Sequence, residues 1–313
     1  MTRIVIGILA LIFAAQGVQA QTVSIGTNPQ GSLAYATGAG VAKVAIEAAG
    51  VNMRVVPQGG PVVTLPLANN AELDFTISNV AASSFAVLGK EMFKGRKQEN
   101  IRLVAVLFPL YGGFYVRDDS DIKTLSDLKG KRIPSKYTKQ KIVGLNSLSV
   151  LNTVGLSYKD VVGVPVPNGV RGVRDFMEGK NDAAYFSLTS GITRQAHAAV
   201  GGIRVLSMEN TPEALAALRS IVPAGSIATL QPAKLYPGIM KPTHVFQASF
   251  VVNASTKTPD DVVYKVVKAL HANKQKLIGS HGMFKQFDPG KMHVDLGVPY
   301  HPGAARFYKE KGL

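Results

Sequence analysis

The sequence predicts an α/β protein of two lobes, and three observations lead to this expectation. From residue 22 onward, short apolar or β-branched runs alternate with stretches of helix length, as is typical of parallel α/β layers. The chain has 313 residues, enough for about two domains at roughly 150 residues each. A Pro/Gly-rich break at 108–113 divides the pattern into two groups of similar size.

The first group contains strands that are each followed by a helix, and it ends on a further strand. The predicted strands are 22–26, 53–57, 74–78 and 101–108. The predicted helices are 32–49, 61–69 and 80–90. Gly50 follows the first helix and is the residue type that most often ends one.

The second group begins with the apolar run 114–117, where we expect the chain to leave one sheet and enter another. The predicted strands are 131–134, 161–166, 183–186 and 203–206. The predicted helices are 138–154, 170–178 and 190–199. Residues 221–241 are expected to be a loop, and a strand at 245–252 and a long helix at 259–278 follow it. The predicted lobes are therefore 21–109 plus 242–313 for lobe I, and 110–241 for lobe II.

The first twenty residues have the pattern of a cleaved secretory signal peptide. Arg3 precedes an apolar run at 4–15 that is too short to span a bilayer, and Val18-Gln19-Ala20 suits signal peptidase. We expect cleavage after Ala20 and a periplasmic location, with a buried N-terminal helix as the alternative. Because no later run of 18 apolar residues follows, no stable membrane insertion is expected.

Composition excludes several classes of function. Without cysteine there are no disulfides, no thiolate metal sites and no cysteine nucleophile. The formal charge is +15, but the basic residues are dispersed, so we expect a small anion and not nucleic acid as the partner. The six histidines lack metal-binding spacing and no Gly-x-Ser-x-Gly elbow occurs. No cofactor, metal or catalytic residue is therefore predicted, and a periplasmic enzyme is the less favoured alternative.

Glycine-containing turns at the ends of predicted strands are the candidate ligand site. The turn from Gly26 to Ser32 has the spacing of a phosphate loop, but Ser32 stands where the lysine would be, which excludes a nucleoside triphosphate. Free N–H groups at a helix N-terminus suit a carboxylate, whereas the alternative makes Ser32 an ordinary helix cap. Ligands of open α/β sheets bind at the carboxyl ends of strands. The expected contacts from these ends are Asn28, Gly31, Ser32, Gln58, Gly59, Ser78, Asn79 and Ser187.

Several segments resemble the TAXI subfamily of TRAP-transporter extracytoplasmic solute-binding subunits. The segments that carry the resemblance are 31–43, 57–60, 121–133, 236–238 and 301–310. They span the mature chain, and the first of them adds Tyr35 to the expected contacts. The resemblance implies a type II periplasmic-binding-protein fold with crossover strands. It further implies closure on an organic acid, such as glutamate or another short carboxylate, and docking on a sodium-coupled permease.

The chain departs from this family at the start of the second lobe. Members often carry a Gly-Ser-Gly-Thr loop there, whereas this chain has a longer basic turn that contains Tyr137 and Lys139. Tyr137 is expected to stack on a flat ligand, and Lys139 or Lys136 to pair with its acid group. The alternative is a solvated basic turn.

The sequence thus predicts a periplasmic protein that captures a small organic acid and delivers it to the membrane subunits of a TRAP transporter. An ABC-permease receptor and a ligand sensor for a two-component system share the expected fold, and both remain alternatives.

Overall fold

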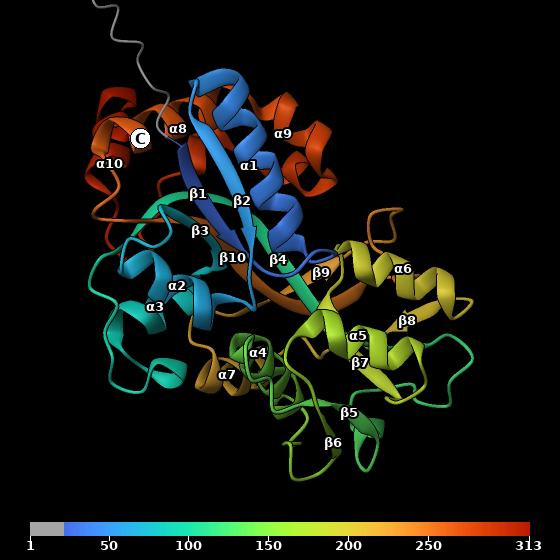
Figure 1. Cartoon of the computed structure of the whole chain (residues 1–313). Coiled ribbons are helices and arrows are strands. Elements are labelled where there is room, and N and C mark those ends of the chain that lie inside the picture. Colours follow the sequence, from blue (N-terminus) through green and yellow to red (C-terminus); the bar gives the residue numbers. More distant parts are fainter. Residues whose placement is uncertain (1–21) are drawn as a thin grey trace, which may run out of the picture.

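The computed structural model describes residues 22–313, so the predicted signal peptide lies outside the described residues. Figure 1 shows two groups of helices around a central sheet, with α1, α8, α9 and α10 at one end and α4, α5 and α7 at the other. The predicted two-lobed α/β class is confirmed. Within residues 22–313, no helix is both long enough and apolar enough to cross a membrane.

The first lobe is built on three parallel strands in the order β2-β1-β3. They are β1 (Thr22–Thr27), β2 (Asn52–Pro57) and β3 (Phe75–Asn79). The helices that follow them are α1 (Leu33–Ala49), α2 (Pro61–Asn69) and α3 (Val80–Leu88). Gly50 ends α1 in the left-handed conformation, as its position in the sequence predicts.

Two long antiparallel strands connect the lobes. They are β4 (Ile101–Arg117) and β10 (Thr243–Ser255), which pair along most of their length. β3 pairs with one half of β10, and β7 (Ala183–Ser187) pairs with the other end of β4. β8 (Ile203–Val205) and β9 (Ser226–Leu230) extend the same sheet beside β4 and β10. The sheet is therefore continuous from one lobe to the other through β4 and β10.

The predicted break at 108–113 is wrong, because β4 runs through it. Pro109 pairs with Ser249 next to a register shift in β10, just before β7 joins the other edge of β4. Gly112 allows Tyr185 to pack closely against β4, because a Cβ added at Gly112 would lie 2.6 Å from Tyr185 Oη. The prediction was correct in one respect, since β4 acquires second-lobe neighbours from Gly112 onward.

The second lobe has its own small parallel sheet and four helices. The strands are β5 (Arg132–Ser135) and β6 (Val162–Pro165). The helices are α4 (Lys141–Asn152), α5 (Gly169–Met177), α6 (Gly191–Ala199) and α7 (Pro212–Ile221). α4 begins three residues after its predicted start, since the N–H groups of Lys139 and Gln140 donate to the Pro167 carbonyl. α7 was not predicted, and β9 lies in the region that was predicted to be a loop.

The C-terminal region returns to the first lobe as three helices. They are α8 (Asp260–Ala272), α9 (Lys274–Ser280) and α10 (Pro302–Lys311). The single helix predicted at 259–278 is wrong, because Asn273 interrupts it. The Asn273 side chain donates to the Ala269 carbonyl at 2.8 Å, a local bond that competes with helix continuation. α8 contacts both α1 and α10, so these helices together cover the first-lobe sheet.

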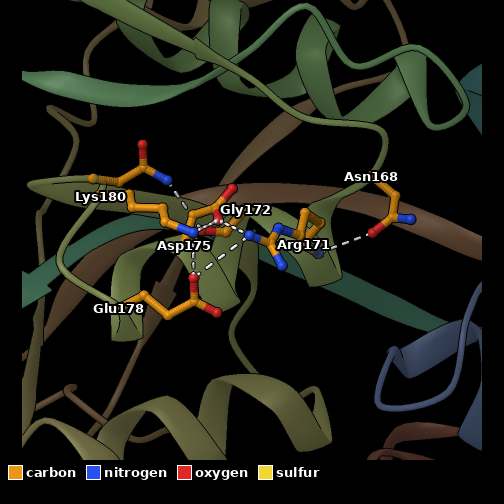
Figure 2. A network of polar contacts seen from close by, with 7 residues as sticks. Asn168, Arg171, Gly172, Asp175, Glu178 and Lys180 are labelled. Carbon is orange, nitrogen blue, oxygen red and sulfur yellow. Dashed lines mark hydrogen bonds and ion pairs between the residues drawn. The ribbon is translucent and has the colours of Figure 1, made fainter.

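A polar network fixes α5 in the second lobe (Figure 2). The side chain of Asn168 caps the helix by accepting from the Arg171 N–H at 2.9 Å. Asp175 is only 6% exposed and contacts Arg171 Nη2 at 2.6 Å and Lys180 Nζ at 3.7 Å. The first residue of α5, Gly169, donates its N–H to Gln140 Oε1 at 2.8 Å. α5 is thereby connected to the start of α4, which borders the candidate site.

Candidate functional site

A cavity of about 50 Å³ lies where the two lobes meet. Asn28 after β1, Asn79 at the end of β3 and Ser187 at the end of β7 all line it. Gly112 of β4 and Phe250 of β10 add the crossover strands to its wall. The cavity is therefore at the carboxyl ends of sheet strands, where ligands of α/β proteins bind.

Four helices begin at this cavity. Residues of the first turns of α1, α2 and α4 line it, together with the cap residue of α3. Ser32 caps α1 by accepting from the Tyr35 N–H at 3.1 Å, and Asn79 caps α3 by accepting from the Ala82 N–H at 2.9 Å. The starts of α2 and α4 have no side-chain cap. Because helix N-termini carry partial positive charge, the cavity favours a negative group.

Three buried polar atoms on the cavity lining have no hydrogen-bond partner among residues 22–313. They are Asn28 Oδ1, Asn146 Oδ1 and Tyr185 Oη. The three residues are 8%, 3% and 3% exposed. Burial raises the pKa of Tyr185 well above its usual 10, so the phenol stays protonated and can donate a hydrogen bond. Since buried polar groups are normally paired, three orphans around one cavity indicate a polar occupant.

None of the 18 residues that line the cavity is charged. The remaining wall is largely apolar and includes Leu33, Ile77, Leu110, Ile142, Phe186 and Phe250. An occupant must therefore be held by dipoles, amides and hydroxyl groups, and its apolar part must contact these side chains.

Five of the eleven expected contact residues line the cavity: Asn28, Ser32, Ser78, Asn79 and Ser187. Ser78 already has partners, because its Oγ lies 2.8 Å from Ser83 Oγ and 3.0 Å from Asn253 Nδ2. The lining role of these five agrees with their placement at strand ends, and their contact with a ligand remains a prediction.

The other six residues lie outside the lining: Gly31, Tyr35, Gln58, Gly59, Tyr137 and Lys139. Three of them join the lobes instead. The Gly31 carbonyl accepts from the Ile192 N–H of α6 at 3.0 Å. Gly59 lies against Lys139, since a Cβ added to Gly59 would be 2.6 Å from Lys139 Cβ. These residues therefore lie at the contact between the lobes.

Tyr137 does not present its ring to the cavity. It is 4% exposed and lies against Gly144 of α4, where an added Cβ would be 3.1 Å from its ring. Together with Leu145 and Leu148 it lines a separate groove of about 700 Å³. Asn146 lines the cavity from the opposite face of the same helix. The expected stacking of Tyr137 on a ligand therefore has no support in the cavity geometry.

Sequence reasoning missed three polar residues of the lining: Gln140, Asn146 and Tyr185. Tyr185 is in a predicted strand, two residues before Ser187, and alternation along a strand would place both on one face. Asn146 is the one polar residue of the cavity-facing set Ile142, Val143 and Asn146 on α4. Helical spacing of an amide among apolar residues was the available signal.

A buried histidine adds a further contact between the lobes. His281 Nδ1 accepts from the Met283 N–H at 3.1 Å, so Nε2 carries the proton toward the Thr189 carbonyl at 3.2 Å. Arg194 Nη1 donates to the same carbonyl at 2.8 Å. Burial, and then the positive charge of Arg194, lower the pKa of His281. Across the described part of the chain, no cluster of three or more potential metal-ligating side chains occurs.

Known structures share this architecture. A solved periplasmic transporter is 17% identical, with 94% of this chain and 93% of that chain covered and a TM-score of 0.58. PhnD1 from Prochlorococcus marinus, solved in complex with methylphosphonate, is 10% identical, with coverages of 93% and 98% and a TM-score of 0.56. The substrate-binding protein of an amino acid ABC transporter is 14% identical, with coverages of 85% and 100% and a TM-score of 0.52. At these identities the likeness establishes the fold, and the predicted two-lobed type II class is confirmed.

A family model described as the NMT1-like family matches residues 25–312, which is nearly all of the described chain. This match does not confirm the TAXI subfamily that the sequence motifs resemble. It establishes that the chain belongs to the NMT1-like family.

Proposed function

We propose that this chain is a periplasmic solute-binding protein that captures a small organic anion between its lobes and delivers it to a membrane permease. The observation that carries the proposal is that three residues with a buried, unpartnered polar atom line one cavity at the starts of four helices. An unpaired buried polar group costs about 1–3 kcal/mol, and a ligand that pairs with Asn28, Asn146 and Tyr185 removes that cost.

The electrostatics of the cavity support an anion. Each helix N-terminus stabilises a negative group by about 0.3–1 kcal/mol at an exposed site, and by more where water is excluded. Tyr185 adds a hydroxyl donor from β7, and no carboxylate side chain lines the cavity to repel the ligand.

Both lobes contribute to the cavity, which supports capture by closure. Asn28 and Asn79 come from the first lobe, whereas Asn146, Tyr185 and Ser187 come from the second. A ligand can touch both sets only when the lobes are together. Bending of β4 and β10 would open the cavity, and the predicted lobe boundaries at 109–110 and 241–242 place the hinge within or beside these strands.

Two classes of permease are compatible with this function. The motif resemblance favours a sodium-coupled TRAP permease, and an ABC permease is the second candidate because a structure of similar fold serves an amino acid ABC transporter. Uptake into vesicles that contain the permease distinguishes them, since a TRAP permease requires a sodium gradient and an ABC permease requires ATP.

A ligand sensor for a two-component system is the third alternative. If deletion of the gene abolishes a kinase response but not uptake, the protein is a sensor.

A thermal-shift screen of small organic acids against residues 21–313 tests the proposal. A ligand at a hundredfold excess over Kd stabilises the protein by about 2.7 kcal/mol. We expect at least one carboxylate to stabilise the protein and neutral sugars to have no effect. The proposal includes no catalytic step, so the acid should be recovered unchanged.

Two variants connect the stabilisation to the cavity. Asn28→Leu removes a lining amide and should reduce the shift. Asn52→Leu removes an exposed amide of β2, whose Nδ2 bonds Thr22 Oγ1 at 2.9 Å, and should leave the shift intact. Stabilisation by sugars but by no carboxylate would refute the anion proposal, and equal shifts in both variants would place the site elsewhere.

A further inference from the structure

The chemistry of the cavity narrows the class of ligand, an inference that rests on the proposed function. We infer that the cavity selects a short 2-hydroxy monocarboxylate, a molecule with one carboxylate, one neutral hydroxyl group and a small apolar remainder. Three properties of the lining lead to this class: the volume, the kinds of unpaired atoms and the absence of charged side chains.

The cavity volume favours a short ligand. At about 50 Å³ the cavity is small, so a short acid suits it better than a long chain. Other side chains of the lining, such as Ile77, Leu110 and Phe250, are apolar, which suits a methyl group or a short alkyl chain.

The unpaired atoms set the functional groups. Tyr185 Oη is a donor without an acceptor, and a carboxylate at the helix starts accepts from it. Asn28 Oδ1 and Asn146 Oδ1 are acceptors without a donor. Their residues line the cavity from opposite lobes, so a hydroxyl group on the ligand can donate to an amide that either lobe supplies.

The absence of charged lining residues excludes two related classes. An ammonium group would lie near four positive helix ends with no Asp or Glu in the lining to pair with it. A second carboxylate would lie against apolar walls, with no Lys, Arg or His in the lining. Amino acids and dicarboxylates are therefore disfavoured, and this includes the glutamate that the motif resemblance suggested.

Four matched acids test the selection by titration calorimetry of residues 21–313: racemic lactate, propionate, alanine and malate. Propionate lacks the hydroxyl group, alanine carries an ammonium group in its place, and malate adds a carboxylate. We expect lactate to bind most tightly and each of the others to bind about tenfold more weakly or worse, because each leaves a buried group unpaired.

A variant on α4 connects this preference to the amide. Asn146→Leu keeps the approximate side-chain size and should bring the affinities for lactate and propionate within about threefold of each other. Asn152→Leu is the control on the same helix, since Asn152 Nδ2 donates to the Ala217 carbonyl away from the cavity, and it should retain the full preference. If Asn146→Leu does not fold, Asn28→Leu makes the same test from the other lobe.

The possible outcomes separate the two proposals. If acids bind in the cavity but propionate, alanine or malate equals lactate, the ligand class is wrong and the anion-binding function stands. If no organic acid stabilises or binds the protein, the proposed function itself is wrong. If Asn146→Leu keeps the same lactate preference as the Asn152→Leu control, the inference is also overturned.

Discussion

Replacement of Tyr185 by Phe should have opposite effects on stability and on ligand binding. The Tyr185 hydroxyl group is buried and has no hydrogen-bond partner within the described part of the chain, although the ring is well packed. The ring makes an edge contact with Phe114, with 5.0 Å between centroids. Tyr185→Phe keeps this packing and removes only the unpaired oxygen.

The magnitudes follow from the cost of an unpaired group. A buried donor without a partner costs about 1–3 kcal/mol, so the free energy of unfolding of Tyr185→Phe should be equal to or about 1 kcal/mol above that of the wild type. A hydrogen bond to a charged ligand contributes about 1.5–3 kcal/mol. Its loss should weaken binding of the acid roughly ten- to 150-fold.

Urea unfolding and titration calorimetry measure the two effects on the same samples. Tyr308→Phe is the matched control, because Tyr308 is also buried but donates to the Val104 carbonyl at 2.6 Å, far along the sheet from the cavity. That variant should lose about 1 kcal/mol of unfolding free energy and bind the acid normally. If Tyr185→Phe instead behaves like Tyr308→Phe in both measurements, the hydroxyl group is not a ligand donor.

Three further predictions concern packing, pH and closure. Gly38→Ala should lower the free energy of unfolding, measured in urea, by about 1–3 kcal/mol, because the added Cβ would clash with Thr27 Cγ2. Gly279→Ala, at an exposed position of α9, should raise it by about 0.5–1 kcal/mol, and a Gly38→Ala protein more stable than Gly279→Ala would contradict this packing. Burial lowers the pKa of His281 below 6.5 in the folded protein, so the unfolded state binds more protons there and the contribution of His281 to stability is present above pH 6.5 and lost as the pH falls. Urea unfolding at pH 5 and pH 8 should show a difference in stability that His281→Gln reduces, and an equal difference in the variant would contradict this. Small-angle scattering should show a smaller radius of gyration with saturating ligand, because the lobes close about β4 near 108–113, and an unchanged radius would count against closure.

The alternation of strands and helices was predictable because each element carries its own local signal. Apolar runs of strand length, helix caps and the left-handed Gly50 depend on neighbours in the sequence, so most elements of the first lobe occur where they were expected. The same reasoning predicted part of the lining of the candidate site. Asn28, Asn79 and Ser187 line the cavity because strand ends meet at one edge of the sheet whatever the details of packing.

The remaining features depend on contacts between distant segments. A Pro/Gly-rich stretch at 108–113 is compatible both with a turn and with a strand, and the pairing of this stretch with the distant strand β10 decides between them. For Tyr137, the local sequence predicted a ligand contact that the packing of distant residues does not support. Its position before a helix suggested a ligand contact, but the later start of α4 and the small Gly144 let the ring pack on the far face.

The central claim is that the cavity between the lobes holds a small organic anion, and a crystal structure with the most strongly stabilising acid tests it most directly. We predict electron density for the acid inside the cavity, with its carboxylate at the starts of the helices and within hydrogen-bond distance of Tyr185 Oη. Asn28 or Asn146 should contact its hydroxyl group. Density for the acid in the groove beside Tyr137, or anywhere else with the cavity unchanged, would contradict the account.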